Sequence, residues 1–152
     1  VQREVARRMT ASPGGKEYGI LSIAVQLWSR PERLFDLLPG CFRPAPKVHS
    51  SALRLNFPPD PLIRVEDERF FFRVVRTAFQ QRRKMLKNSL VGLLRGREDS
   101  VIQVLSDAGV DPHLRPEAVS MAQFEQVCRG LAALMQDRTP ADAQKGTRIG
   151  TA

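Results

Sequence analysis

The chain has 152 residues, of which 42% are hydrophobic. This composition excludes a wholly disordered protein and allows one core, or the end of one domain plus a small second one. The longest apolar stretches, such as residues 20–27, are too short to cross a bilayer, and no secretory signal opens the sequence. The 24 lysines and arginines against 16 acidic residues give a net charge of +8. That balance favours a nucleic acid as partner over a merely basic soluble protein.

Two helices are predicted near the start of the chain. Residues 2–11 have a helical pattern, because apolar and basic positions fall on different faces, and the Ser-Pro-Gly-Gly run at 12–15 ends it. Residues 18–28 are apolar and ambiguous between helix and strand. The spacing of the larger side chains favours a helix with one face made of Leu21, Val25 and Trp28.

Two strands are predicted next. Residues 33–38 predict a short strand, which Pro39-Gly40 closes. Residues 42–46 form a loop that contains prolines. Residues 48–57 alternate more cleanly between apolar and polar side chains, which is the pattern of a strand with two different faces.

The composition changes at the proline-rich segment 58–61, which we interpret as a linker between two domains. The region after it predicts three helices with apolar stripes. These stripes are Phe71, Val75, Ala78 and Phe79; Val101, Val104, Leu105 and Ala108; and Phe124, Val127, Leu131 and Leu134. Gly109 is the predicted end of the second helix, and Ser120 with Gln123 forms a capping-box pattern before the third. Residues 136–152 are polar, small and charged, and predict a disordered tail.

A basic cluster is the strongest local signal. Residues 79–90 contain four cations within six positions, at Arg82, Arg83, Lys84 and Lys87. On a helix Arg83 and Lys87 would share one face, where like charges repel unless a polyanion neutralises them. Arginine and lysine side chains suit phosphate oxygens, so the cluster predicts contact with RNA or DNA. The alternative is a solvated basic helix face.

A second signal is the loop around Phe42. Its prolines restrict the backbone and would hold the aromatic ring in a fixed place beside the following strand. A rigid, partly exposed aromatic ring suits stacking on an extruded base. From the pattern alone, a hydrophobic plug between strand and helix is the better interpretation.

The remaining reactive residues indicate no catalytic machinery. Cys41 and Cys128 have no metal-ligand spacing and predict two free thiols in a reducing cytoplasm. His49 and His113 stand alone, so we expect surface or structural roles and no metal site. The sequence has no glycine-rich phosphate loop and no arrangement for nucleophilic catalysis.

Taken together, these segments resemble the ribosomal RNA adenine dimethylase family over about residues 1–135. Residues 42–50 are similar to the family's F-x-P-P-P-K-V-D-S stretch, and residues 79–90 to its F-x-Q-R-R-K-x-L-x-N-x-L signature. Ala45 stands in place of a third proline and His49 in place of an Asp. Further similar segments are 1–6, 16–22, Asp111-Pro112, 115–117 and Ser120.

The resemblance implies an S-adenosylmethionine-dependent enzyme that methylates N6 of adenines in small-subunit rRNA. It implies that Phe42 packs against the flipped adenine, which raises the stacking role above the plug. It also implies that Arg82, Arg83, Lys84 and Lys87 contact rRNA, together with Arg115 of the helical region. The family's donor site and its Asn-Leu-Pro-Tyr motif match no positions here. S-adenosylmethionine would therefore be bound by an N-terminal half that the sequence lacks.

The resulting expectation is an α/β plus α fold. Residues 1–57 would be the end of a Rossmann-like methyltransferase domain, 58–61 a linker and 62–135 a helical RNA-binding domain. The chain begins with Val inside a helical pattern, so we expect a piece of a longer protein that is inactive alone. Expected partners are small-subunit rRNA or the assembling small subunit, with no membrane and no metal, in the cytoplasm or an organelle. Two alternatives stay open: a non-catalytic RNA-binding or ribosome-assembly module, and the antibiotic-resistance branch that methylates large-subunit rRNA.

Overall fold

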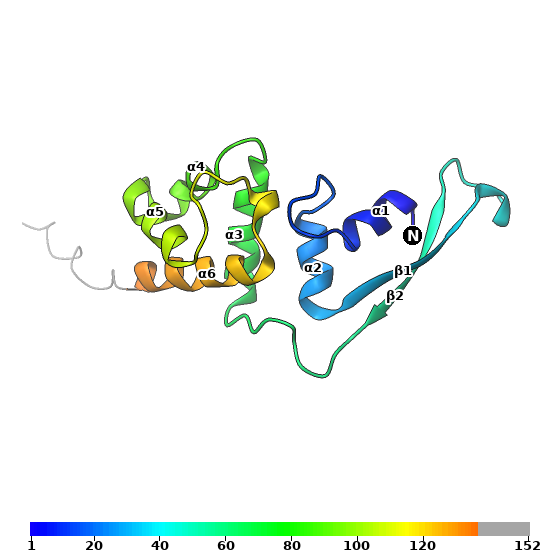
Figure 1. Cartoon of the computed structure of the whole chain (residues 1–152), viewed down its shortest axis with the longest axis horizontal. Helices are drawn as coiled ribbons and strands as arrows, with labels where there is room; N and C mark the ends of the chain where they lie inside the picture. The colour runs from blue at the N-terminus through cyan, green and yellow to red at the C-terminus, as the bar shows by residue number, and fades with distance from the viewer. Residues whose placement is uncertain (137–152) are drawn as a thin grey trace, which may run out of the picture.

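A computed structural model describes residues 1–136, and Figure 1 shows two groups of elements side by side. The first group contains the helices α1 (Arg3–Met9) and α2 (Ile20–Trp28) and the strands β1 (Arg30–Leu37) and β2 (Ser50–Asn56). The second contains the helices α3 (Glu68–Gln80), α4 (Leu86–Leu90), α5 (Glu98–Asp107) and α6 (Met121–Gln136). Short 3-10 turns occupy Pro39–Cys41, Val91–Leu94 and Pro116–Ala118. The predicted tail beyond Gln136 lies outside the described residues.

The predicted mixture of helix and strand is confirmed. Within residues 1–136, no helix is long and apolar enough to cross a bilayer. The division into a methyltransferase end and a helical domain, with a boundary at 58–61, stays a prediction.

The strands form an antiparallel hairpin whose register runs from Arg30 opposite Asn56 to Leu37 opposite Ser50. β1 begins three residues earlier than predicted and includes Pro31. A proline is tolerated because β1 is an edge strand among the described residues, where a missing N–H donor need not break a ladder. The other edge of β2 carries a short bridge from Gln2 to Ser50.

The buried core lies among the helices and is not built from the strands. Apolar side chains of α3, α4, α5 and α6 form one cluster, which Tyr18, Ile23 and Leu27 join from the first group. The rings of Tyr18 and Phe79 meet edge to face at 6.3 Å, so this contact joins segments on either side of residues 58–61.

Helix α2 was predicted correctly, but its buried face was not. Ser22, Ile23 and Leu27 are buried, whereas Trp28 is 48% exposed. Most positions of α2 are apolar, so tertiary contacts rather than periodicity select the buried side. Ser22 can be buried because its hydroxyl donates to the carbonyl of Arg8 at 2.5 Å and accepts from the N–H of Gly19 at 3.1 Å.

The last two helices follow their sequence signals closely. Gly109 has a φ of +65° and ends α5, and the N–H of Val110 donates to the carbonyl of Leu105 at 2.9 Å. The capping box also forms, because the N–H of Gln123 donates to the Ser120 hydroxyl at 3.2 Å and the Gln123 side chain accepts from the N–H of Ser120 at 3.0 Å. Both predicted apolar stripes face the core.

The hairpin leaves large apolar side chains uncovered within the described structure. Phe35 is 57% exposed, and Leu34, Leu38, Leu55 and Phe57 are also exposed. At the base of the hairpin, Trp28 and Leu27 border a hollow of about 340 Å³ together with Pro61, Ile63 and Val65. The segment after the predicted linker therefore passes beside the end of α2.

Candidate nucleic-acid interface

Three cations of the basic cluster, Arg82, Arg83 and Lys84, lie on a turn, and Lys87 lies on the next helix, so the cluster is not on one continuous helix. Helix α3 ends at Gln80, residues 81–85 form the turn, and α4 begins at Leu86. The N–H of Lys84 closes the turn by donating to the carbonyl of Gln81 at 2.8 Å. Arg83 and Lys87 therefore do not share a helix face, and the repulsion expected at that spacing does not arise.

Arg82 is engaged inside the molecule. Its guanidinium donates from Nη2 to the carbonyl oxygens of Lys16 and Tyr18, each at 3.0 Å. The same group lies over the ring of Phe79, 5.8 Å from the ring centroid. Arg82 thus links the end of α3 to the loop before α2, a pair of hydrogen bonds that the sequence did not predict.

Lys87 is engaged as well. Its ammonium group forms an ion pair with Glu98 at 2.7 Å, and only 20% of the lysine side chain is exposed. The pair ties the first turn of α4 to the first turn of α5. A carboxylate at this distance competes with any phosphate for the lysine charge.

Arg83 and Lys84 are both exposed, and neither pairs with a carboxylate within residues 1–136. The turn borders an open hollow of about 450 Å³, which is lined by residues 79–84. A surface of this kind, with two unpaired cations in front of a hollow, can hold a phosphate group.

The structure brings Arg115 next to the turn. The N–H of Leu86 donates to the carbonyl of Leu114 at 2.7 Å, and the N–H of Lys87 donates to that of Pro112 at 3.2 Å. These two bonds hold the segment that carries Arg115 against the start of α4. Arg115 is exposed and lies just before the turn Pro116–Ala118. The backbone segment that leads into Arg115 is therefore fixed beside the start of α4, which directly follows the turn with Arg83 and Lys84.

Phe42 lies in the loop between β1 and β2, well away from the turn between α3 and α4 (Figure 1). It directly follows the 3-10 turn Pro39–Cys41, and its N–H donates to the carbonyl of Pro39 at 3.2 Å. The side chain is 38% exposed and does not belong to the buried cluster. The loop therefore leaves the ring partly exposed at the surface.

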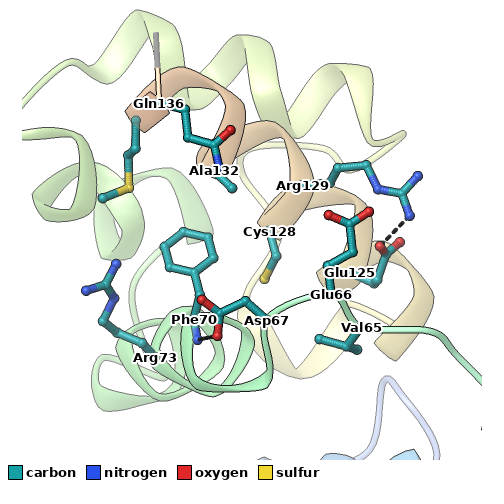
Figure 2. Close-up of a pocket in the computed structure, with 11 residues that line it drawn as sticks. Val65, Glu66, Asp67, Phe70, Arg73, Glu125, Cys128, Arg129, Ala132 and Gln136 are labelled. Atoms are coloured by element: carbon teal, nitrogen blue, oxygen red, sulfur yellow. Dashed lines mark hydrogen bonds and ion pairs between the residues drawn. The ribbon is translucent and has the colours of Figure 1, made fainter. Parts of the chain in front are cut away.

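A separate cavity of about 240 Å³ lies between the start of α3 and α6 (Figure 2). Its lining mixes Glu66, Asp67 and Glu125 with Arg73 and Arg129. Figure 2 also shows the Glu125–Arg129 ion pair, whose atoms are 2.6 Å apart, at one side of this cavity. Opposite charges occur together here, so the cavity does not favour either an anion or a cation.

Among the described residues, no three His, Cys, Asp or Glu side chains lie together in a way that could hold a metal ion. Both cysteines are free, with Cys41 exposed and Cys128 buried. Burial, helped by the negative charge of Glu125, raises the pKa of the Cys128 thiol to about 12, so it stays protonated near neutral pH. His113 is exposed, and its Nδ1 lies 3.0 Å from Asp111.

Residues 1–132 match the family model described as Ribosomal RNA adenine dimethylase. The chain belongs to the ribosomal RNA adenine dimethylase family. It is 49% identical over 127 residues to the ribosomal RNA small subunit methyltransferase A of Desulfitobacterium hafniense, an alignment that covers 84% of this chain and 45% of that protein. The protein of the same name from Syntrophotalea carbinolica is 45% identical over 128 residues, and the alignment covers 84% of this chain and 48% of that protein. The chain spans about half the length of the curated relatives it matches.

Solved structures of rRNA methyltransferases share the fold of this family member. A dimethyladenosine transferase from Plasmodium falciparum aligns with a TM-score of 0.68 at 20% identity, over 83% of this chain and 53% of that one. The 23S rRNA methyltransferase ErmE aligns with a TM-score of 0.57 at 24% identity, over 86% of this chain and 52% of that chain. At these identities the likeness establishes the fold.

The methyl donor that the family implies does not fit the residues described here. A dinucleotide or nucleoside site of the Rossmann type needs a glycine-rich turn between a parallel strand and a helix. The sheet in residues 1–136 is an antiparallel hairpin, and the glycines with positive φ (Gly14, Gly96 and Gly109) lie in loops that follow helices or 3-10 turns. No step of donor chemistry is therefore assigned to these residues.

Proposed function

We propose that this chain supplies the RNA-docking and target-base-stacking part of a small-subunit rRNA (adenine-N6,N6)-dimethyltransferase. The observation that carries the proposal is that backbone hydrogen bonds from Leu86 and Lys87 hold the segment before Arg115 against the start of α4, next to the turn that exposes Arg83 and Lys84. The names of the relatives support small-subunit rRNA as the substrate rather than large-subunit rRNA. S-adenosylmethionine is the proposed donor, bound outside the described residues, so the chain alone is proposed to be inactive.

In this proposal Arg83, Lys84 and Arg115 bind rRNA phosphates. Contacts of this kind position a protein on RNA without reading its sequence. Arg82 and Lys87 lie on the same surface but contribute less, because their charged groups already bind Lys16, Tyr18 and Glu98. The proposed location of the protein is the cytoplasm, or an organelle that contains ribosomes.

The test is the salt dependence of RNA affinity in the full-length protein. On a single strand, each lost phosphate contact lowers the slope of log affinity against log salt by about 0.7. Arg83→Ala/Lys84→Ala should therefore lower the slope by about 1.4, and Arg115→Ala by about 0.7. The matched comparison is Arg82→Ala, which should change the slope little while lowering thermal stability. An unchanged slope in the double variant would reduce the cluster to a solvated surface.

Phe42 is proposed to stack on the target adenine. An aromatic ring that stacks on a base contributes about 1–3 kcal/mol by alanine substitution, so Phe42→Ala should lower turnover by about 5- to 150-fold. Phe42→Trp should retain most activity, since it keeps a planar face. Phe35→Ala, at an exposed position in the same hairpin, is the control. If Phe42→Ala reduces RNA affinity as much as turnover, the ring has only a structural role.

A second candidate, a non-catalytic RNA-binding or ribosome-assembly module, is favoured by the absence of a donor site in residues 1–136. The upstream reading frame distinguishes the two. A glycine-rich motif after a strand, followed by Asn-Leu-Pro-Tyr, supports the enzyme. A start codon close to Val1 supports the module.

A further inference from the structure

One face of α3 carries a line of arginines outside the basic cluster. Arg69, Arg73 and Arg76 are four and three residues apart, which places them on the same side of the helix. All three residues are exposed. The other side of α3 is buried in the core through Phe71, Val74, Val75, Ala78 and Phe79. We call the three arginines the α3 ridge.

Nearby acidic side chains balance the α3 ridge only in part, because Arg73 lines the cavity between α3 and α6 together with Glu66, Asp67 and Glu125. None of the three arginines forms an ion pair with a carboxylate of residues 1–136. The acidic residues closest in sequence lie at the start of α3, where Asp67 accepts a hydrogen bond from the N–H of Phe70 at 2.9 Å. Like charges three and four residues apart repel each other, and a bound polyanion relieves that repulsion.

Arg73 has an additional constraint. Its guanidinium carbon lies 4.9 Å from the centroid of the Phe70 ring, which is one helical turn earlier on α3 (Figure 2). Stacking on the ring fixes the group while leaving its N–H donors able to bind an anion. The middle of the ridge is therefore partly ordered before any ligand binds.

The ridge leads directly to the turn between α3 and α4. Gln80 lies four residues after Arg76 on the same face, and it lines the 450 Å³ hollow together with Arg83 and Lys84. At 1.5 Å per residue, the rises between the ridge arginines are about 6 and 4.5 Å. Such a series of separated charges suits consecutive phosphates of one strand better than a single small anion.

We infer that the α3 ridge binds the phosphate backbone of an RNA strand that continues from the hollow at the turn along α3. The inference rests on the proposed function and extends its contact surface by about 10 Å of helix. The acidic residues at the start of α3 oppose binding there. Contact is therefore strongest at Arg76 and weakest at Arg69.

The experiment measures affinity for oligouridylate against salt concentration in the full-length protein. Oligouridylate presents a uniform single-stranded backbone, so its binding reports phosphate contacts rather than base recognition. Arg69→Ala/Arg76→Ala should lower the log–log slope by up to about 1.4, most of it from Arg76. Arg69→Lys/Arg76→Lys keeps both charges and should retain the slope. Helical circular dichroism checks that α3 is intact.

The control variant is Arg30→Ala/Arg54→Ala, which removes the same charge from exposed positions of the hairpin and should leave the slope nearly unchanged. If the Arg83→Ala/Lys84→Ala slope falls but the ridge variant binds like wild type, the ridge inference is overturned and the proposed function stands. If both variants bind like wild type, the ridge inference and the proposed function are both overturned.

Discussion

The β1–β2 hairpin and the helices α3–α6 are stabilised by different interactions. No apolar side chain of either strand is among the fully buried residues, whereas α3, α4, α5 and α6 supply most of the buried cluster. The hairpin is held by its backbone ladder and by contacts with α1 and α2. A two-stranded ladder is only marginally stable in water, so side-chain substitutions should act very differently in the two regions.

The largest expected effect is in the helical core. Phe124 is fully buried and lies 6.0 Å from the ring of Phe79. Phe124→Ala removes that contact and leaves a cavity, which should lower the free energy of unfolding by about 3–5 kcal/mol. Denaturant unfolding followed by circular dichroism measures the change.

The matched substitution in the hairpin is Phe35→Ala. Phe35 is more than half exposed, so the same chemical change should alter the free energy of unfolding by only about 0.5 kcal/mol. Equal losses for the two phenylalanines would contradict the contrast between the regions. They would indicate that the apolar face of the hairpin is covered in solution.

A medium effect is expected where α5 and α6 cross. A Cβ atom added to Gly130 would lie 2.8 Å from Cγ1 of Val104, so Gly130→Ala should destabilise the protein by about 1–3 kcal/mol. Alanine's helix propensity alone would predict a gain of about 1 kcal/mol, so the sign of the change distinguishes close packing from propensity. The double variant with Val104→Ala should lose less than the sum of the two single variants, because the clash disappears.

The smallest effect concerns acid pH and the hairpin. The Ser51 hydroxyl donates to Asp36 at 2.6 Å, and this bond, together with Arg33, Arg3 and Arg7, lowers the pKa of the Asp36 carboxyl. A lowered folded-state pKa stabilises the fold above the unfolded pKa of about 3.9, and that contribution is lost as the pH falls through the folded value.

Asp36→Asn should therefore reduce the loss of hairpin stability on acidification below about pH 4. The measurement is amide hydrogen exchange in β1 and β2, compared between wild type and variant at neutral and acid pH. If wild type and Asp36→Asn lose the same hairpin stability in acid, other carboxylates control the acid sensitivity. The carboxyl is at the surface, where solvent screens such interactions, so the difference should be small.

Signals that are local in the sequence were predicted well. Gly109, the capping box of Ser120 and Gln123, and the apolar stripes of α5 and α6 all depend on residues within one or two turns of each other. The two strands were found for the same reason, although Pro31 concealed the start of β1. Whether a strand tolerates a proline depends on its position in the sheet, and the sequence does not contain that information.

Features that depend on distant contacts were missed. The break in the helix at Gln81 is accompanied by bonds from Leu86 and Lys87 to the segment before Arg115, about 25 residues away. The Arg82 guanidinium donates hydrogen bonds to carbonyl groups in the loop before α2, far away in the sequence. A run of cations in the sequence therefore predicted a basic surface but did not indicate which of its cations are engaged inside the molecule. The roles of Phe42 and the basic residues stay predictions.

The position of Trp28 gives the molecule an intrinsic optical reporter. The chain has one tryptophan and one tyrosine. Tyr18 is buried against Phe79, while the half-exposed indole of Trp28 borders the hollow beside Pro61 and Val65. Emission from the indole should shift to shorter wavelength if that segment packs more closely on α2, and to longer wavelength if it separates. Fluorescence can thus follow the junction between the hairpin and the helices without any label.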